Sequence, residues 1–447
     1  MSKKISSALD IIERQIKPLL PNKFCIAFSG GVDSTVLLHA MKNIIDEKSQ
    51  IRAIHINHNI VDNSKAWTKT CKSICKNFGI DIEIISLELT HNGYGLEAAA
   101  RDERYERLKE KLYENEYLLT AHHEEDQMET VFLRMARGTG LDGLQGINEK
   151  YSFGKGIIFR PMLEVSKASV MDYAKEHQLK WVEDSSNQDT HFDRNFLRKK
   201  IIPQFRERWP SIASSVSRLS QLSAQNIKIL NQIAEEDIGP MANMNELPLA
   251  ILLDKSFERV NNILRYIIIA NGMSIPSMKT LQNGLKEMLD PETDKSVIAW
   301  KGYCIRKYKN NLYFLSNSVL EPNQVDVRIP WEIGKTVNLG ENIGTIEATF
   351  IHGDGLSIEK CKNKLTISYR QGGELIKPTG HRINKSLKNL FQENQILPWM
   401  RDKIPLIYYQ DELVSVADLW FNQNYVASQN EAGFVVNWHK KMIIKQN

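Results

Sequence analysis

The first third of the chain alternates short apolar runs with longer segments of helical periodicity. Five apolar runs predict buried strands, at residues 24–28, 51–57, 81–87, 117–121 and 156–160. Amphipathic segments between them predict helices at 64–78, 96–114 and 124–137. Strands that alternate with helices are typical of a parallel sheet with helices on both faces. We therefore expect an α/β, Rossmann-like fold for this part of the chain.

The pattern changes after residue 161, where helical segments come first and strands follow. Helices are predicted at 166–177, 195–209, 212–236 and 256–270, and strands at 296–300, 303–308 and 312–316. The final segment mixes strands with a short helix at 385–393, and Gly239-Pro240 and Glu321-Pro322-Asn323 interrupt the periodic pattern. We predict a catalytic domain at 1–215 and two smaller α+β domains at 216–320 and 325–447.

Composition indicates a globular protein, and the absence of long apolar runs limits the cellular compartments that we expect for it. The chain has 447 residues, of which 42% are hydrophobic and 25% charged, and its net charge of +4 is too small to identify a nucleic-acid partner. The N-terminal segment, with Ile5, Leu9, Ile12 and Ile16 among charges, predicts an amphipathic helix and no signal peptide. No apolar run approaches the length of a membrane span, so we expect a cytoplasmic protein with no membrane partner. The oligomeric state is left open.

The cysteines argue against several classes of site. There are five of them, and no Cys-x-x-Cys spacing occurs: Cys25, Cys71, Cys75, Cys304 and Cys361. An odd, scattered set of this kind disfavours a disulfide scaffold, a zinc ribbon and a cluster site.

A glycine-rich turn follows the first predicted strand and precedes a predicted helix. Its residues are Ser29, Gly30, Gly31, Val32, Asp33 and Ser34. Glycines allow close backbone approach to a ligand, and the N–H groups of a first helical turn attract anions. The lysine of the Gly-x-x-x-x-Gly-Lys-Ser/Thr motif is absent, which excludes an ordinary kinase or GTPase loop. Gly-Gly turns are often only structural, but the flanking strand and helix favour nucleotide binding, with Asp33 as a magnesium ligand.

A second candidate site begins where the fourth strand ends. Asp126 and Glu129 are three residues apart on the helix predicted there, so both carboxylates lie on one face. Such a pair binds a metal or an amine, or acts as a base. A solvated acidic surface is the alternative for an arbitrary helix. The position at the ligand-binding end of a parallel sheet favours function. His122 and His123 lack zinc-ligand spacing.

Basic residues form the remaining candidates. Arg101 and Arg104 on one predicted helix suit phosphate oxygens, and surface pairing with Glu97 and Asp102 explains them equally well. Arg194 lies in a basic stretch at 193–208, and a second basic segment spans 377–388. Such stretches are usually solvated helix faces or loops. Two of them in separate domains suit an elongated polyanion better than a small metabolite.

Taken together, these motifs resemble those of the tRNA(Ile)-lysidine synthetases, a branch of the N-type ATP pyrophosphatases (PP-loop superfamily). The matching blocks run through the whole chain: Ser29-Gly30-Gly31-Val32-Asp33-Ser34, His55-Ile56-Asn57-His58, Leu96-Glu97-Ala98-Ala99-Ala100-Arg101 with Arg104-Tyr105, Thr120-Ala121-His122-His123, Arg134 with Arg137-Gly138, Glu183-Asp184-Ser185-Ser186-Asn187, Arg194-Asn195, Arg370 with Gly372-Gly373, Lys385 with Leu387-Lys388, and Pro398-Trp399 with Arg401-Asp402. The first block alone specifies only the superfamily, whereas the later blocks together are specific.

The resemblance implies an enzyme that uses ATP to join free L-lysine to C2 of the wobble cytidine of a minor isoleucine tRNA with a CAU anticodon. An adenylated cytidine is the intermediate, and AMP and pyrophosphate are released. The product, lysidine, changes decoding from AUG to AUA. Adenylation is chemically necessary because the C2 oxygen is otherwise a poor leaving group.

The resemblance also implies a fold of the adenine nucleotide alpha-hydrolase type for the catalytic domain, and it assigns roles to residues. Ser29, Gly30, Gly31, Asp33 and Ser34 are expected to hold the ATP phosphates, with Mg²⁺ near Asp33. Asp126 and Glu129 are expected to bind the lysine amine. Arg101 or Arg104, and Arg194, are expected to offset charge on the adenylate. The two later domains are expected to hold the tRNA.

Three kinds of protein are the main alternatives. A tRNA thiolase of the same superfamily normally needs paired cysteines, and an amidotransferase-type synthetase needs a glutaminase with a nucleophilic cysteine. A non-catalytic RNA-binding relative would not need Asp33, Asp126 and Glu129, which are present.

Overall fold

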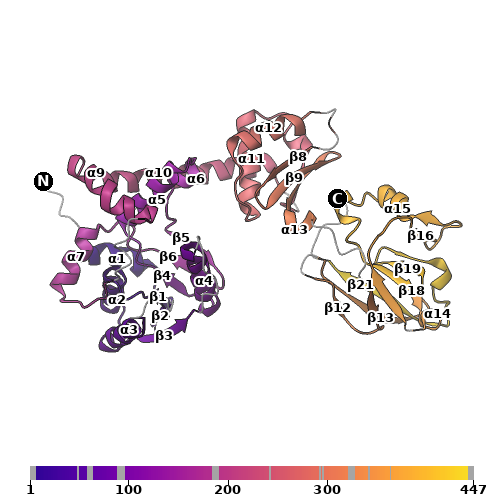
Figure 1. Cartoon of the computed structure of the whole chain (residues 1–447), viewed down its shortest axis with the longest axis horizontal. Helices are drawn as coiled ribbons and strands as arrows, with labels where there is room; N and C mark the ends of the chain where they lie inside the picture. The colour runs from indigo at the N-terminus through magenta and orange to yellow at the C-terminus, as the bar shows by residue number, and fades with distance from the viewer. Residues whose placement is uncertain are drawn as a thin grey trace. The chain divides into compact units, whose positions relative to one another are not determined.

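The chain folds into two compact units, Met1–Leu230 and Asn231–Asn447 (Figure 1). The computed structural model describes residues 7–47, 50–57, 64–87, 96–183, 191–240, 243–290, 293, 296–320, 328–340, 343–362 and 364–440, without the side chains of 64–65 and 96–102. The predicted division into three domains, with boundaries near 215 and 320, stays a prediction.

The first unit is built on a six-stranded sheet in the order β3-β2-β1-β4-β6-β5. Its strands are β1 (Phe24–Ala27), β2 (Ile51–Asn57), β3 (Asp81–Ser86), β4 (Tyr117–Leu119), β5 (Lys150–Phe153) and β6 (Gly156–Phe159). All neighbouring pairs are parallel except β5 and β6, which form an antiparallel hairpin. The five predicted strands are confirmed. β5 escaped prediction because it is an edge strand with mostly exposed side chains and no apolar alternation.

Helices cover both faces of this sheet, as predicted. They are α1 (Ala8–Ile16), α2 (Val32–Ile44), α3 (Ser64–Phe78), α4 (Leu96–Lys111), α5 (Glu124–Ala136), α6 (Leu141–Leu144) and α7 (Lys167–Glu176), with a 3₁₀ turn η1 (Lys17–Leu19). Successive residues of β1 point to opposite faces. Phe24 and Ile26 pack with the helices α1, α2, α3 and α7, whereas Cys25 packs with Leu108 of α4.

A helical region follows. The predicted helix at 195–209 is divided into α8 (Asp193–Phe196), a π-helical turn η4 (Leu197–Ile201) and α9 (Ile202–Arg208), and α10 (Ile212–Ile238) comes next. The division has a sequence cause: Pro203 lacks an N–H group and disfavours a continuous α-helix through this point.

The strand order places the candidate chemistry. The chain runs from β1 outward to β2 and β3, then returns to β4 on the other side of β1. In an open parallel sheet, the carboxyl ends of two such strands flank the ligand crevice. The turn at Ser29 follows β1 and the segment at His123 follows β4, so these two segments lie next to each other at this edge.

An ion pair lies at the opposite edge of the sheet. Arg52, at the start of β2, donates from Nε and Nη2 to the two carboxylate oxygens of Glu116, at 2.8 and 2.7 Å. Glu116 precedes β4 and is 1% exposed. The hydrogen bond to Glu116 is the main reason why the pKa of Arg52 is raised. The pair joins the two strands that flank β1.

The second unit is dominated by antiparallel sheets. Its first part has the sheet β7-β10-β9-β8, covered by two main helices. The elements are β7 (Glu246–Pro248), η5 (Leu249–Ile251), α11 (Phe257–Ala270), α12 (Met278–Met288), β8 (Val297–Trp300), β9 (Tyr303–Tyr308), β10 (Asn311–Ser316) and α13 (Asn317–Leu320). The predicted helix 256–270 and the three predicted strands are confirmed within one residue; α12 and β7 were not predicted.

The last part combines a five-stranded sheet, a four-stranded sheet and a two-stranded ladder around one hydrophobic core. Its elements are β11 (Ile329–Trp331), β12 (Val337–Asn338), β13 (Thr345–His352), β14 (Leu356–Ser357), α14 (Ile358–Cys361), β15 (Leu365–Ser368), β16 (Leu375–Ile376), β17 (Lys385–Ser386), α15 (Leu387–Glu393), η6 (Pro398–Met400), β18 (Leu406–Tyr409), β19 (Glu412–Val416), β20 (Trp420–Phe421), η7 (Gln423–Tyr425) and β21 (Ala432–His439). None of the helices that the structure describes has the length and apolarity required to cross a bilayer.

Candidate active site

The glycine turn is held in a conformation that only glycine adopts without strain. Gly30 has φ of +86°, and a Cβ atom at this position would lie 2.6 Å from Cys71 Sγ and 2.7 Å from Trp67 Nε1. Trp67 Nε1 donates a hydrogen bond of 2.8 Å to the carbonyl of Ser29. Two side chains of α3 therefore shape the turn from behind, through contacts that leave no room for a side chain on Gly30.

The N-terminus of α2 is arranged to accept an anion. Gly31 is the N-cap residue, and no side chain caps the helix there. The hydroxyl groups of Ser29 and Ser34 lie 3.0 Å apart, and Ser34 Oγ donates to the carbonyl of Gly31 at 3.0 Å. Backbone N–H groups at an uncapped helix start are the usual ligands of a phosphate. The geometry fits the predicted nucleotide site.

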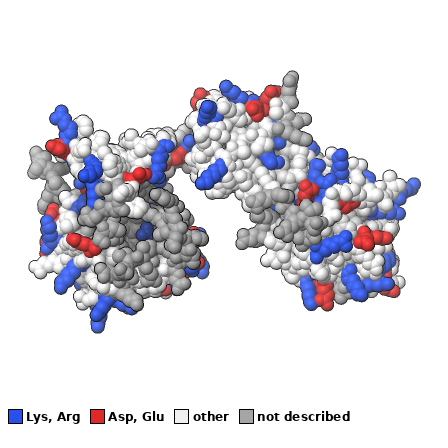
Figure 2. Space-filling model, viewed as in Figure 1, with Lys and Arg blue, Asp and Glu red and all other residues white. Residues whose placement is uncertain are grey.

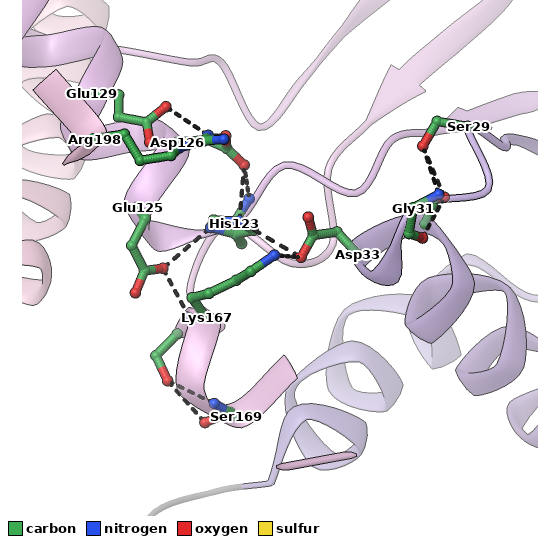
Figure 3. A network of polar contacts seen from close by, with 12 residues as sticks. Ser29, Gly31, Asp33, His123, Glu125, Asp126, Glu129, Lys167, Ser169 and Arg198 are labelled. Atoms are coloured by element: carbon green, nitrogen blue, oxygen red, sulfur yellow. Dashed lines mark hydrogen bonds and ion pairs between the residues drawn. The ribbon is translucent and has the colours of Figure 1, made fainter. Parts of the chain in front are cut away.

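Asp33 lies on the first turn of α2 and connects the loop to the rest of the site (Figure 3). Its Oδ1 atom accepts a hydrogen bond of 2.5 Å from Lys167 Nζ, which comes from the first residue of α7. His123 Nε2 lies 3.7 Å from the same oxygen. His123 is the N-cap residue of α5 and is buried.

The acidic pair lies on the same network. His123 donates its backbone N–H to Asp126 Oδ2 at 3.0 Å, and its Nε2 atom lies 3.4 Å from that oxygen. Asp126 is 9% exposed and Glu129 is 1% exposed. Both point to one side of α5, as the spacing predicted. They are not a solvated acidic surface, because carboxylates this buried require cationic partners.

Two arginines supply those partners. Arg194 of α8 donates from Nε to Glu129 Oε2 at 2.7 Å and from Nη2 to Asp126 Oδ1 at 2.8 Å. Arg198 of the π-helical turn donates from Nε to Glu129 Oε1 at 2.6 Å and from Nη2 to Glu129 Oε2 at 2.9 Å. Its Nη2 atom also contacts Asp126 Oδ1 at 3.3 Å.

The charges shift the pKa values of the buried groups. Burial alone would raise the pKa of Asp126, but the charges of His123, His122 and Arg194 outweigh it and lower the pKa to about 2. Burial would lower the pKa of His123, yet its hydrogen bond to Glu125 and the charges of Asp126 and Asp33 raise it. Both shifts favour the charged forms, so the network is an array of ions.

The other predicted site residues have different outcomes. Arg104 lies on α4, where its guanidinium is 5.7 Å from the ring of Tyr105. The side chain of Arg101 lies outside the described residues, as do His58 and residues 184–187 of the Glu-Asp-Ser-Ser-Asn block. Arg194 contacts the acidic pair, a partner that the sequence did not indicate.

Three residues of the network were not singled out from the sequence. Lys167 had no visible signal and Arg198 was noted only as part of the basic stretch at 193–208, because their acidic partners are far away in the chain. His123 was named within the Thr-Ala-His-His block and was otherwise considered only as a zinc ligand. Its position directly before the helix that carries Asp126 was a usable signal, since an N-cap residue contacts the first turn of its own helix. Among the described residues, no group of three or more His, Cys, Asp or Glu side chains is arranged to hold a metal ion by itself.

Comparison with known protein families accounts for most of the chain. Residues 6–205 match the PP-loop domain, residues 247–313 the TilS substrate binding domain, and residues 365–438 the TilS substrate C-terminal domain. The chain is 36% identical over 419 residues to the tRNA(Ile)-lysidine synthase of Coxiella burnetii, covering 93% of each chain. It is 35% identical over 425 residues to that of Legionella pneumophila (strain Lens), covering 93% of this chain and 95% of the relative.

A third relative, the tRNA(Ile)-lysidine synthase of Methylococcus capsulatus, is 32% identical over 424 residues, with 92% and 95% coverage. The similarity therefore extends through the catalytic and the substrate-binding parts together. The resemblance inferred from the motifs is confirmed: the chain belongs to the tRNA(Ile)-lysidine synthase family of ATP-dependent PP-loop ligases, which form lysidine in tRNA.

Proposed function

We propose that this protein adenylates the C2 oxygen of the wobble cytidine in a CAU-anticodon isoleucine tRNA and then transfers free L-lysine to C2. One observation carries the proposal. A continuous set of contacts runs from Asp33 through His123 to Asp126, and so joins the anion-binding loop to the buried acidic pair. An enzyme that combines a triphosphate with an amine needs these two kinds of site next to each other.

On the nucleotide side, the uncapped start of α2 and the hydroxyls of Ser29 and Ser34 bind the phosphates of ATP. Lys167 supplies the cation that the loop itself lacks, and its ammonium is already beside the loop on Asp33. In the first step the cytidine C2 oxygen forms a bond to the α-phosphorus of ATP, and the bond to pyrophosphate breaks. Backbone N–H groups and Lys167 stabilise the charge that develops on the phosphates.

Asp33 is the proposed ligand of Mg²⁺. Its carboxylate is 31% exposed, at the rim of the loop. Mg²⁺ bound to a nucleotide takes most of its ligands from phosphate and water and only one or two carboxylates from the protein. A single aspartate therefore fits this ion. When bound, the ion would neutralise phosphate charge.

On the amine side, Asp126 and Glu129 bind the ammonium of lysine. In the second step a carboxylate first takes a proton from the ammonium, the neutral amine nitrogen then attacks C2, the C2–O bond breaks and AMP leaves, and the second proton of the attacking nitrogen is lost to solvent. Asp126 is a poor proton acceptor, because the charges of His123, His122 and Arg194 lower its pKa to about 2. Glu129 is the proposed acceptor. Arg194 is the proposed partner of the departing AMP, and Arg101 or Arg104 the partner of the adenylate.

The second unit is proposed to hold the tRNA. On the face drawn in Figure 2, Lys and Arg side chains of this unit stand among Asp and Glu side chains. A cavity of about 550 Å³ lies in its last part, lined among others by Arg328, Gly372, Gly373 and Lys377. Basic side chains and positive-φ glycines at one site suit a phosphate backbone that approaches the main chain closely.

Mass analysis of a CAU-anticodon isoleucine tRNA transcript, after incubation with the protein, ATP and L-lysine, tests the proposal. We expect the mass increase of one lysine molecule less one water on the wobble cytidine, and pyrophosphate release that depends on the tRNA. Without lysine, the tRNA should be recovered either adenylated or unmodified, and no lysidine should form. A methionine tRNA serves as control. A product that requires a sulfur donor in place of lysine would instead establish a thiolase, although the five cysteines are all buried and unpaired.

A further inference from the structure

Every carboxylate oxygen of the acidic pair already has a donor. Among the described residues, each of the four carboxylate oxygens of Asp126 and Glu129 faces either an arginine or His123. An ammonium that approaches these oxygens therefore competes with a cationic side chain that is already in place. Breaking such a contact without replacement is costly, so binding and displacement are one event.

Every carboxylate of the wider cluster also has a cationic partner. Asp33, Glu125, Asp126 and Glu129 face Lys167, Arg194, Arg198 and Arg206, and His123 lies against three of them. One more cation would add positive charge that no carboxylate of the cluster is left to offset. A bound nucleotide reverses the situation, since its phosphates attract cations that are now shared with the carboxylates.

Arg198 is the donor best suited to leave. Glu129 Oε1 accepts its hydrogen bond from Arg198 Nε. Both arginines hold Glu129 closely, Arg198 at 2.6 and 2.9 Å and Arg194 at 2.7 Å, but the contact with Asp126 is longer for Arg198, at 3.3 Å, than for Arg194, at 2.8 Å. The side chain of Arg198 is 42% exposed, compared with 32% for Arg194. Arg198 lies on a π-helical turn, and such turns are frequent at functional sites.

We propose that the Arg198 guanidinium occupies the position of the substrate ammonium on Glu129, so that lysine binds only by displacing it, and that nucleotide phosphates promote this displacement. This inference rests on the proposed function, in which Glu129 binds the lysine amine. Arg198 is thus a positioning residue that couples the two substrate sites. By reciprocity, lysine and nucleotide should each strengthen the binding of the other.

The test is calorimetric titration of L-lysine into the full-length protein without tRNA, with and without a non-hydrolysable ATP analogue and Mg²⁺. For the wild type we expect the analogue to tighten lysine binding about tenfold or more. Arg198→Gln should bind lysine about tenfold more tightly than the wild type without nucleotide, and should respond little to the analogue. Lys200→Gln is the matched control, since it removes the same charge from an exposed position on the same π-helical turn. It should behave as the wild type does.

Methylguanidinium provides a readout that a merely structural role would not change. Added to Arg198→Gln, it should compete with lysine and restore weak binding. Arg198→Lys should give an intermediate affinity, because one ammonium replaces a fork of donors. Unchanged or weaker lysine binding in Arg198→Gln, or equal binding by the wild type with and without nucleotide, would overturn the inference. If the wild type forms lysidine in the tRNA assay while these results fail, only the inference is lost; if it binds no lysine and forms no lysidine, the proposed function fails as well.

Discussion

The nucleotide side and the amine side of the site are prepared in opposite ways. At the glycine turn, backbone donors at the start of α2 are left without a side-chain cap. At the acidic pair, two arginines contact both carboxylates. The first site offers free donors to an anion, whereas the second is filled by cations of the protein itself. Under the proposed function, ATP therefore meets a preformed site, whereas lysine exchanges with a side chain.

The largest effects are expected from substitutions that remove one side of the site each and so block different steps of the reaction. Asp33→Ala should abolish adenylation, with a loss of at least about a hundredfold. The variant lacks the proposed Mg²⁺ ligand and the carboxylate that holds Lys167, and these two cations stabilise the charge on the phosphates. Glu129→Ala should leave adenylation partly intact and block lysine transfer. Pyrophosphate release and lysine incorporation, measured separately with tRNA, check both. Circular dichroism controls for folding, since Glu129 is buried. Equal loss of both steps in Glu129→Ala would show that the sides are not separate.

The second prediction concerns the preformed loop. Gly30→Ala should abolish ATP binding and destabilise the first unit by about 1–3 kcal/mol, because the new Cβ would collide with α3 at an unfavourable φ. Gly272→Ala is the control, with φ of +67° and no neighbour within 4 Å of its Cβ. It should cost only about 1 kcal/mol. Urea unfolding measures the loss of stability, and nucleotide titration measures the loss of binding. Similar losses of stability in both variants would show that the collision with α3 contributes nothing.

The third prediction uses pH to examine the amine side. The pKa of Asp126 is about 2, below its unfolded value of about 4. Its ionised form therefore adds stability above about pH 4, and this contribution is lost as pH falls toward 2. Asp126→Asn should be less stable than the wild type at pH 7, and the difference should narrow below pH 4. Urea unfolding of both proteins between pH 3 and 7 measures it. A constant difference would mean that the charges of His123, His122 and Arg194 do not lower this pKa.

The smallest effect is expected at the rim of the amine side. Arg137 Nη2 lies 3.2 Å from Asp193 Oδ2, and both side chains are well exposed. Arg137→Gln should change the free energy of unfolding by less than about 1 kcal/mol, as is usual for such pairs. A double-mutant cycle with Asp193→Asn measures the coupling. A larger coupling would show that this pair helps to fix α8, which carries Arg194.

Local patterns in the sequence predicted the parts of the molecule that local chemistry determines. The apolar runs of β1 and β4 and the spacing of Asp126 and Glu129 are readable because each lies within one element. The edge strand β5 is polar, and many strands of the last part are only two residues long, so neither carries a periodic signal.

The partners of the site residues were not readable for a related reason. Lys167 is 134 residues from Asp33, and Arg198 is 69 residues from Glu129. Such pairings result from how the sheet and the helices fold together, and no spacing rule reports them. Arg194 was found through its motif, but its contact with the acidic pair follows only from the three-dimensional structure.

The ion pair between Arg52 and Glu116 has a consequence for how this domain tolerates change. It fastens β2 to β4 around the central strand, at the end remote from the loops that meet ATP. The strands are thereby joined at one end of the sheet, and the candidate active site lies at the other. Because the alignment of the strands does not depend on the side chains of the active-site end, those side chains can place like charges close together without weakening the sheet.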